Sequence, residues 1–323
     1  MAEMSKKIRF HDEEKLKNIN KETMKLFNKY KVDMSIRELS PKTISGYEND
    51  LQHWFIYIYD NQANQCITEL DEDDITEFLY YCKTEGNNTE RMKRRMASIS
   101  AFYKYLRKKR IIAENPMEFI DRPKKGVPII VQTFLTKEQV DLMRLKLKEY
   151  RENGGFNGRE YQLYALFSLS TMARVNAVAN LRWEQIDFDQ RICEKVLEKE
   201  GKYVTLYFSE EVKDLLLDMK RYREDNEVDD SGYVFYSIVN GNIQPITNGT
   251  LDQWCKKIGV MINVPTLHPH DFRHSGSQLL KLSGMPIEEI SELLNHSGLD
   301  VTKKHYLRQD KQKIQASKDK YSF

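Results

Sequence analysis

A mainly α-helical protein of two domains, with one small β-sheet, is predicted by three features of this 323-residue sequence. Apolar residues recur at helical spacing along most of the chain, whereas residues 186–208 alternate in the manner of β-strands. A basic segment marked by proline and glycine, residues 122–131, interrupts the helical pattern and predicts a linker. The length also suits two domains of about 150 residues each.

The composition is typical of a globular chain, with 40% hydrophobic and 31% charged residues. No stretch approaches the roughly 18 consecutive apolar residues that a membrane helix requires, and the N-terminal segment does not resemble a signal peptide. The four cysteines are scattered and have the spacing of neither a metal site nor a disulfide framework. We therefore expect a cytoplasmic protein with no membrane partner and no bound metal.

The first 121 residues predict an arm followed by a helical domain. Residues 1–39 contain one or two polar helices with a loose apolar stripe, which fits either an appended arm or a helix packed on the domain. The domain is predicted over 40–121, where Ser40 and Pro41 mark a helix start. A second helix is expected at 68–82 and a third at 90–109.

Positive charge is concentrated in the third of these helices and in the linker. The net charge of the chain is only +2, yet residues 91–125 contain twelve Lys or Arg against three Asp or Glu. A basic face of this kind is typical of a phosphate-binding surface. An ordinary solvated helix is the competing interpretation of the same pattern.

The second domain, residues 132–323, is predicted to be mixed α/β. Thr136 and Gln139 have the pattern of a capping box, so a helix is expected at 137–151. Further helices are expected at 160–172, 174–182, 209–225, 247–260, 270–283, 286–295 and 299–308. The polar residues 309–323 are expected to form a C-terminal tail.

Four short motifs follow one another in this second domain. They are Ser170-Thr171-Met172-Ala173-Arg174, the His270-x-x-Arg273 box, Leu293-Leu294-Asn295-His296, and Thr302-Lys303-Lys304-His305-Tyr306. In order and spacing the set resembles the signature of the tyrosine recombinases, or phage integrases. The first domain resembles the family's core-binding domain through Ser40, Thr43 and Tyr47, the basic helix, and Asn115-Pro116. The resemblance covers roughly residues 38–308.

The resemblance implies a reaction in which a tyrosine replaces a DNA phosphodiester by a phosphotyrosine and is later released. Because the bond energy is kept, no cofactor is required. Two arginines would clamp the charge on the non-bridging oxygens, and a histidine would act on the nucleophile's proton. The implied catalytic set is Arg174, Lys199, His270, Arg273, His296 and Tyr306, with Lys202 as the alternative to Lys199. Taken singly, each of these residues also fits an ordinary structural role.

The same resemblance implies double-stranded DNA as the partner, gripped between the two domains, and leaves room for a homo-oligomer on DNA. Helical spacing and the linker's charge then predict which residues face the duplex. The predicted DNA-facing residues are Lys42, Thr43, Arg91, Lys93, Arg94, Arg95, Arg122, Lys124 and Lys125.

Three positions depart from the family's pattern. Met172 and Asn295 stand where glycine is usual, and Ala177 stands where an acidic residue usually supports the first arginine. Loss of such support weakens a site. The whole chain also resembles the lysogeny repressors of SPβ-like prophages, which have an integrase-like fold. We therefore expect a DNA-binding repressor with weakened or lost strand exchange. An active recombinase using Tyr306 is the alternative, and a helical protein–protein adaptor is a third interpretation.

Overall fold

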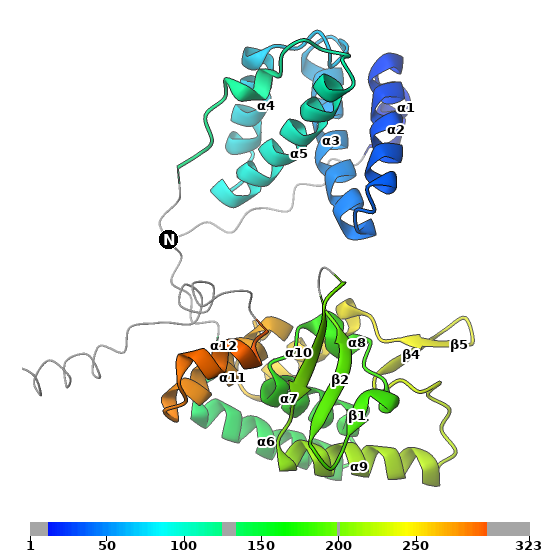
Figure 1. Ribbon diagram of the computed structural model, residues 1–323, viewed down its shortest axis with the longest axis vertical. Coiled ribbons are helices and arrows are strands. Elements are labelled where there is room, and N and C mark those ends of the chain that lie inside the picture. The colour runs from blue at the N-terminus through cyan, green and yellow to red at the C-terminus, as the bar shows by residue number, and fades with distance from the viewer. Residues whose placement is uncertain (1–11, 125–133, 199–200, 296–323) are drawn as a thin grey trace, which may run out of the picture. The chain divides into compact units, whose positions relative to one another are not determined.

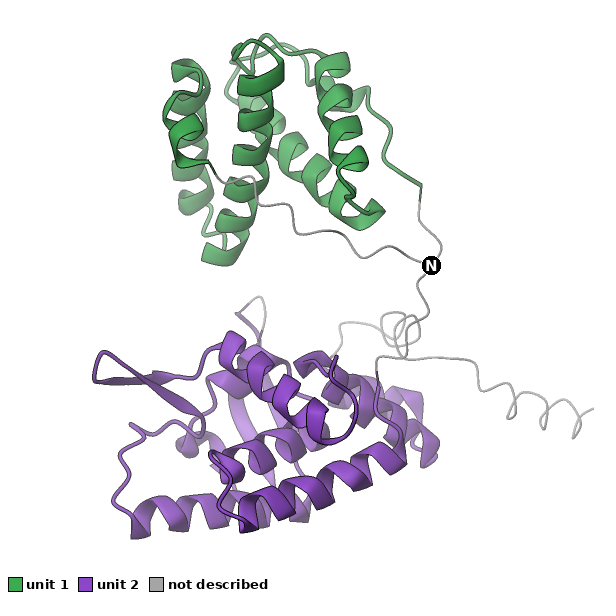
Figure 2. Ribbon diagram, turned by 180° about the vertical axis from the view of Figure 1, so that it is seen from behind, with its two compact units in different colours: residues 1–130 green, residues 131–323 purple. Residues whose placement is uncertain are grey.

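The computed structural model describes residues 12–124, 134–198 and 201–295, and the structural statements below concern these ranges. The chain forms two compact units, residues 1–130 and 131–323 (Figure 2). This division falls within the segment that the sequence predicts as a linker. The predicted fold class, mainly helical with small sheets, is confirmed.

Unit 1 is a helical bundle around an aromatic core (Figure 1). Its elements are α1 (Glu13–Lys17), α2 (Lys21–Ile36), α3 (Pro41–Asn61), α4 (Glu72–Thr84), α5 (Thr89–Lys108) and the short 3-10 helix η1 (Pro116–Glu118). Ser40 caps α3 as predicted, because its hydroxyl accepts the backbone N–H of Thr43. Helix α4 starts four residues later than predicted, since Asp71 and Asp74 form a capping box there.

Helix α2 is an integral part of this core. Phe27 packs edge-on against Phe55, with ring centroids 5.3 Å apart, and Tyr30 stacks on Phe102 at 5.0 Å. Of the two interpretations of residues 1–39, the structure thus favours a packed helix over an appended arm. No domain boundary falls at the predicted residue 40, because α2 and α3 share one hydrophobic core.

Unit 2 is built around α7 (Gly158–Thr171), which is buried on nearly all sides. The longer helices that surround or follow it are α6 (Lys137–Glu152), α9 (Glu210–Asp225), α10 (Asn248–Met261) and α11 (Pro269–Leu282). The remaining helices are short: α8 (Val175–Ala179), the 3-10 helix η2 (Trp183–Gln185) and α12 (Ile287–Leu293). Thr136 and Gln139 form the predicted capping box of α6. The helix predicted at 299–308 lies outside the described ranges.

The predicted β-rich stretch forms an antiparallel sheet of three strands, in the order β1 (Ile186–Asp187), β2 (Ile192–Leu197) and β3 (Tyr203–Tyr207). Leu197 pairs with Tyr203, so the turn between β2 and β3 covers residues 198–202. A second hairpin, β4 (Tyr236–Val239) and β5 (Asn242–Pro245), projects from the side of the unit and was not predicted (Figure 1). The sequence does contain a signal for this hairpin, because Asn240-Gly241 is a typical two-residue hairpin turn. Both residues have positive φ.

Candidate functional site

Helix α11 positions two of the predicted catalytic residues. His268 is the N-cap, and its backbone N–H donates to the carboxylate of Asp271 at 2.8 Å. The helix therefore begins just before His270, which lies in its first turn. Arg273 follows three residues later, on the same side of the helix.

Arg273 is buried, with 1% of its surface exposed. Its Nη1 donates to the carbonyl oxygen of Met172 at 2.6 Å, and its Nη2 donates to the carbonyl oxygen of Leu294. Met172 and Leu294 are the C-caps of α7 and α12. The guanidinium thus satisfies carbonyls at two helix C-termini, where a positive charge is favourable.

Two of the three departures from the family's pattern occupy left-handed backbone. Met172 has φ 54° and Asn295 has φ 50°. This region favours glycine and tolerates asparagine, but it is strained for methionine. The side chain of Met172 is buried against Ile290 and Leu294, and this packing offsets the strain. Both turns therefore keep the conformation that glycine would adopt.

The third departure, Ala177, is accompanied by an ion pair of Arg174 with a residue from another part of the chain. Ala177 is buried in the core and carries no carboxylate. Instead, the Nη1 of Arg174 donates to the carboxylate of Glu198, which directly follows β2. The Glu198 side chain is only 2% exposed, whereas that of Arg174 is 35% exposed. The inward position of Glu198 could have been predicted, because Val196 two residues earlier is buried and strand residues alternate between faces.

His270 lies among positively charged neighbours. Its ring meets that of His274 edge-on, with centroids 4.6 Å apart. Partial burial, together with the charges of His274, Arg273, His268 and Arg174, lowers the pKa of His270 to about 4. The imidazole is therefore neutral near pH 7 and can accept a proton.

The structure thus places three members of the implied catalytic set in one region: His270 and Arg273 are one turn apart on α11, and Arg273 donates to the carbonyl oxygen of Met172, two residues before Arg174. Lys199, His296 and Tyr306 lie outside the described ranges. Lys202 is exposed, and its carbonyl oxygen accepts the backbone N–H of Glu198 at 2.8 Å.

In unit 1, a buried carboxylate organises the basic face of α5. Asp50 on α3 accepts the Nε of Arg94 at 3.0 Å and the hydroxyl of Ser98 at 2.9 Å. The Nη2 of Arg91 lies 3.5 Å from the other oxygen of Asp50. Arg94 keeps half of its side chain exposed. Two guanidiniums share one carboxylate, so this face retains a net positive charge.

The two residues of α3 that are predicted to face DNA lie in its first turn. Lys42 and Thr43 are exposed there. One turn after Lys42, the carbonyl oxygen of Gly46 accepts a long hydrogen bond from Nη2 of Arg94, at 3.4 Å. A Cβ at Gly46 would lie 3.2 Å from that nitrogen, so the small residue lets the arginine approach α3. We call Lys42, together with Arg91 and Arg94 that pair with Asp50, the basic face of unit 1.

Arg95 does not belong to this face, and its predicted position is wrong. It is 2% exposed, donates from Nε to the side-chain oxygen of Asn87 at 3.0 Å, and lies over the ring of Phe78. Burial lowers the pKa of this guanidinium. The physical reason is its place on the helix, three residues after Met92 and four before Ile99, both buried.

The other residues predicted to face DNA differ in their ion pairing and exposure. Lys93 pairs with Glu90 in the preceding turn at 3.1 Å. Arg122 and Lys124 are exposed at the end of the described part of unit 1, and Lys125 lies outside it.

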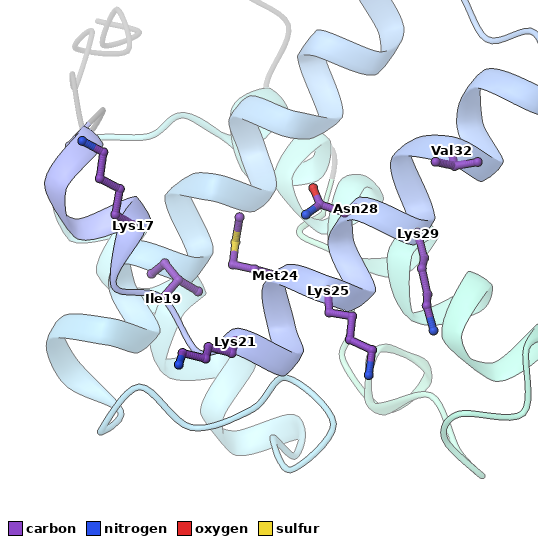
Figure 3. A pocket seen from close by; sticks show the side chains of 8 residues that line it. All are labelled: Lys17, Ile19, Lys21, Met24, Lys25, Asn28, Lys29 and Val32. Atoms are coloured by element: carbon purple, nitrogen blue, oxygen red, sulfur yellow. The ribbon is translucent and has the colours of Figure 1, made fainter.

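A further basic surface of unit 1 was not predicted. Four lysines surround a shallow hollow along α1 and α2 (Figure 3). The residues lining it are Lys17, Ile19, Lys21, Met24, Lys25, Asn28, Lys29 and Val32. Lys21, Lys25 and Lys29 recur every fourth residue, so they share one side of α2. We call this the lysine hollow, and it offers a charge-matched comparison for the basic face.

The four cysteines are free and buried. Among the described residues, no three His, Cys, Asp or Glu side chains are grouped so that they could hold a metal ion. No helix within the described ranges is long and apolar enough to span a membrane.

Comparison with known proteins places both units in one group. Residues 133–313 match the phage integrase family, and residues 27–110 match the N-terminal SAM-like domain of phage integrases. Tyrosine recombinase XerC of Pediococcus pentosaceus is 24% identical over 309 residues, which cover 92% of this chain and 98% of that protein.

Two solved structures show the same fold. The Tn1549 transposon integrase in complex with transposon right end DNA has a TM-score of 0.65 at 18% identity, covering 93% of this chain and 99% of that chain. The XerH site-specific recombinase bound to its difH substrate has a TM-score of 0.65 at 17% identity, covering 94% and 92%.

Proposed function

Because this chain belongs to the phage integrase family of tyrosine recombinases, we propose that it binds double-stranded DNA at specific sequences, using both units. The observation that carries DNA binding is the pair Arg91 and Arg94 on α5, which the buried Asp50 of α3 holds in place. Guanidiniums suit phosphate oxygens, and side chains that are already ordered lose less entropy on binding. The solved structures of the Tn1549 integrase and XerH with DNA support the same partner.

In unit 2, the cluster of Arg174, His270 and Arg273 is proposed to meet a single phosphate group of the duplex. The exposed Arg122 and Lys124, together with Lys125, are proposed to follow the DNA backbone. Contacts of this kind set position and affinity, while contacts with base edges set sequence preference.

We further propose that the biological role is that of a cytoplasmic repressor whose strand exchange is weakened or lost. Both Nη atoms of Arg273 donate to backbone carbonyls within a buried environment. Fewer of its donors then remain for the charge that develops on a phosphate during cleavage. Removing one preorganised donor of this type typically costs about 2.7–4 kcal/mol of barrier.

Active recombination through Tyr306 is the second candidate, and a specific observation favours it. Glu198 supplies Arg174 with a carboxylate despite Ala177, and His270 is neutral near pH 7. In this account Tyr306 attacks the phosphate, His270 takes up its proton, and His296 donates a hydrogen bond to a phosphate oxygen. Lys199 or Lys202 protonates the departing 5′ oxygen.

Binding-site selection from genomic DNA fragments tests the shared part of both candidates. Affinity for the selected site is then measured by mobility shift over a range of salt concentrations. Binding through phosphates predicts that log affinity falls linearly with log salt, by about 0.9 per contacted phosphate. No DNA binding at moderate salt would contradict the proposal and favour the protein–protein adaptor.

The variant Tyr306→Phe separates the two candidates in a cell that carries the selected site upstream of a reporter. A repressor keeps its effect on the reporter, because the hydroxyl has no part in binding. A recombinase loses the exchange between two copies of the site.

A further inference from the structure

We infer that Glu198 is the positioning residue for Arg174, and that it takes the place of the carboxylate missing at Ala177. This inference rests on the proposed function of unit 2 as a phosphate-binding site. It identifies how that site remains organised in this chain, which no family motif of the sequence indicates.

The first support is the contact itself. The carboxylate of Glu198 accepts a hydrogen bond from Nη1 of Arg174, and its side chain is almost completely buried. A buried carboxylate is stable only when it is paired, so the two charges depend on one another. Within the described part of the chain, the other oxygen of Glu198 has no hydrogen-bond partner. The ion pair with Arg174 compensates this buried charge.

The second support is that the contact leaves Arg174 able to bind a ligand. About a third of the arginine side chain remains exposed. In this pair the buried Glu198 orients the guanidinium, and the partly exposed Arg174 is the residue that contacts a ligand.

The third support is the position of Glu198 on the turn between β2 and β3. Its backbone N–H donates to the carbonyl oxygen of Lys202, which closes the hairpin. Glu198 also directly precedes Lys199 in sequence. The ion pair therefore joins Arg174 to the residue at which β2 ends and the turn begins.

The first test needs no DNA. The side-chain Nε–H resonance of Arg174 is assigned in a ¹⁵N spectrum of the full chain by its loss in Arg174→Ala. An oriented guanidinium exchanges slowly with water, so Glu198→Gln is expected to broaden or remove this resonance. The exposed strand residue Glu194 provides the control Glu194→Gln, which should leave it unchanged. An unaltered resonance in folded Glu198→Gln overturns the inference.

The second test is a double-mutant cycle in affinity for the selected DNA. Glu198→Gln is expected to weaken binding at least about threefold, as is typical for residues coupled in one ion-pair network. In the Arg174→Ala background the same change should have no further effect. Additive losses would overturn the inference. A gain in affinity would do so too, since it would mean that Glu198 competes with the phosphate.

If Glu198→Gln does not fold, both tests are made with Glu198→Asp. This variant keeps the charge but shortens the reach, and it should shift the Arg174 resonance and reduce affinity in an Arg174-dependent way. A chain that binds no DNA leaves the spectroscopic test intact, so failure of the proposed function is distinguishable from failure of this inference.

Discussion

Met172 lies directly against the backbone of Gly276, so closely that a Cβ at position 276 would be 2.6 Å from its Cγ. The same Cβ would be 2.4 Å from the carbonyl oxygen of Leu169. The C-terminal end of α7 thus packs on α11 at a point where only glycine fits. This contact holds Met172 in its left-handed conformation and places its carbonyl oxygen beside Arg273.

Gly276→Ala is therefore expected to destabilise unit 2 by about 1–3 kcal/mol, the usual cost of overpacking a closely packed contact. The measurement is the free energy of unfolding from denaturant titration. Gly249→Ala in α10 is the control, because the nearest atom to a Cβ there is 3.6 Å away and the helical backbone is unstrained. Equal effects of the two substitutions would contradict this account of the α7–α11 contact.

The basic face of unit 1 makes a prediction about salt dependence. Arg91→Ala with Arg94→Ala should lower the slope of log affinity against log salt by about 1.8, if each guanidinium contacts one phosphate at about 0.9 each. The control removes two charges from the lysine hollow by Lys21→Ala with Lys29→Ala. If the salt dependence of affinity falls as much in the lysine variant as in the arginine variant, the basic face is not the DNA-binding surface.

Arg95 is expected to act on stability alone. Arg95→Ala removes a buried side chain that is hydrogen-bonded to Asn87 and packed on Phe78, so we expect a loss of about 1–3 kcal/mol in the free energy of unfolding. The salt slope of DNA binding should stay at the wild-type value below the melting temperature. A reduced slope in the folded variant would show that Arg95 reaches the duplex after all.

His270 predicts a pH dependence of defined sign. Its folded-state pKa of about 4 lies below the value of about 6.5 for an unperturbed histidine. The unfolded chain therefore binds the proton first as pH falls, and the folded state loses stability between about pH 6.5 and 4. His270→Gln should reduce this loss. In the NMR titration of the wild type, a midpoint for the His270 ring at or above pH 6.5 would contradict the prediction.

Much of the fold follows from local rules. The N-caps Ser40 and Thr136 marked two helix starts correctly because capping depends on residues only three positions apart. The charge of Arg95 favours an exposed position, whereas its spacing places it on the buried stripe of α5. Its spacing from Met92 and Ile99, both buried, is a local signal for this position.

Other features depend on contacts between distant segments. The left-handed backbone of Met172 has no local signal, because methionine does not prefer that region. Its conformation depends on packing against α11 and α12. The ion pair of Arg174 with Glu198 likewise joins residues 24 positions apart. Alternation along β2 indicates only that Glu198 faces inward, whereas its partner is a matter of tertiary structure.

The central claim, a DNA-binding protein with weakened or lost strand exchange, is tested most directly with a selected site nicked near the position of cleavage. A nicked substrate traps any covalent phosphotyrosine, which a denaturing gel separates from free DNA. The account predicts tight binding on a native gel and little or no covalent adduct on the denaturing gel. An abundant adduct that disappears in Tyr306→Phe would contradict it and establish an active recombinase.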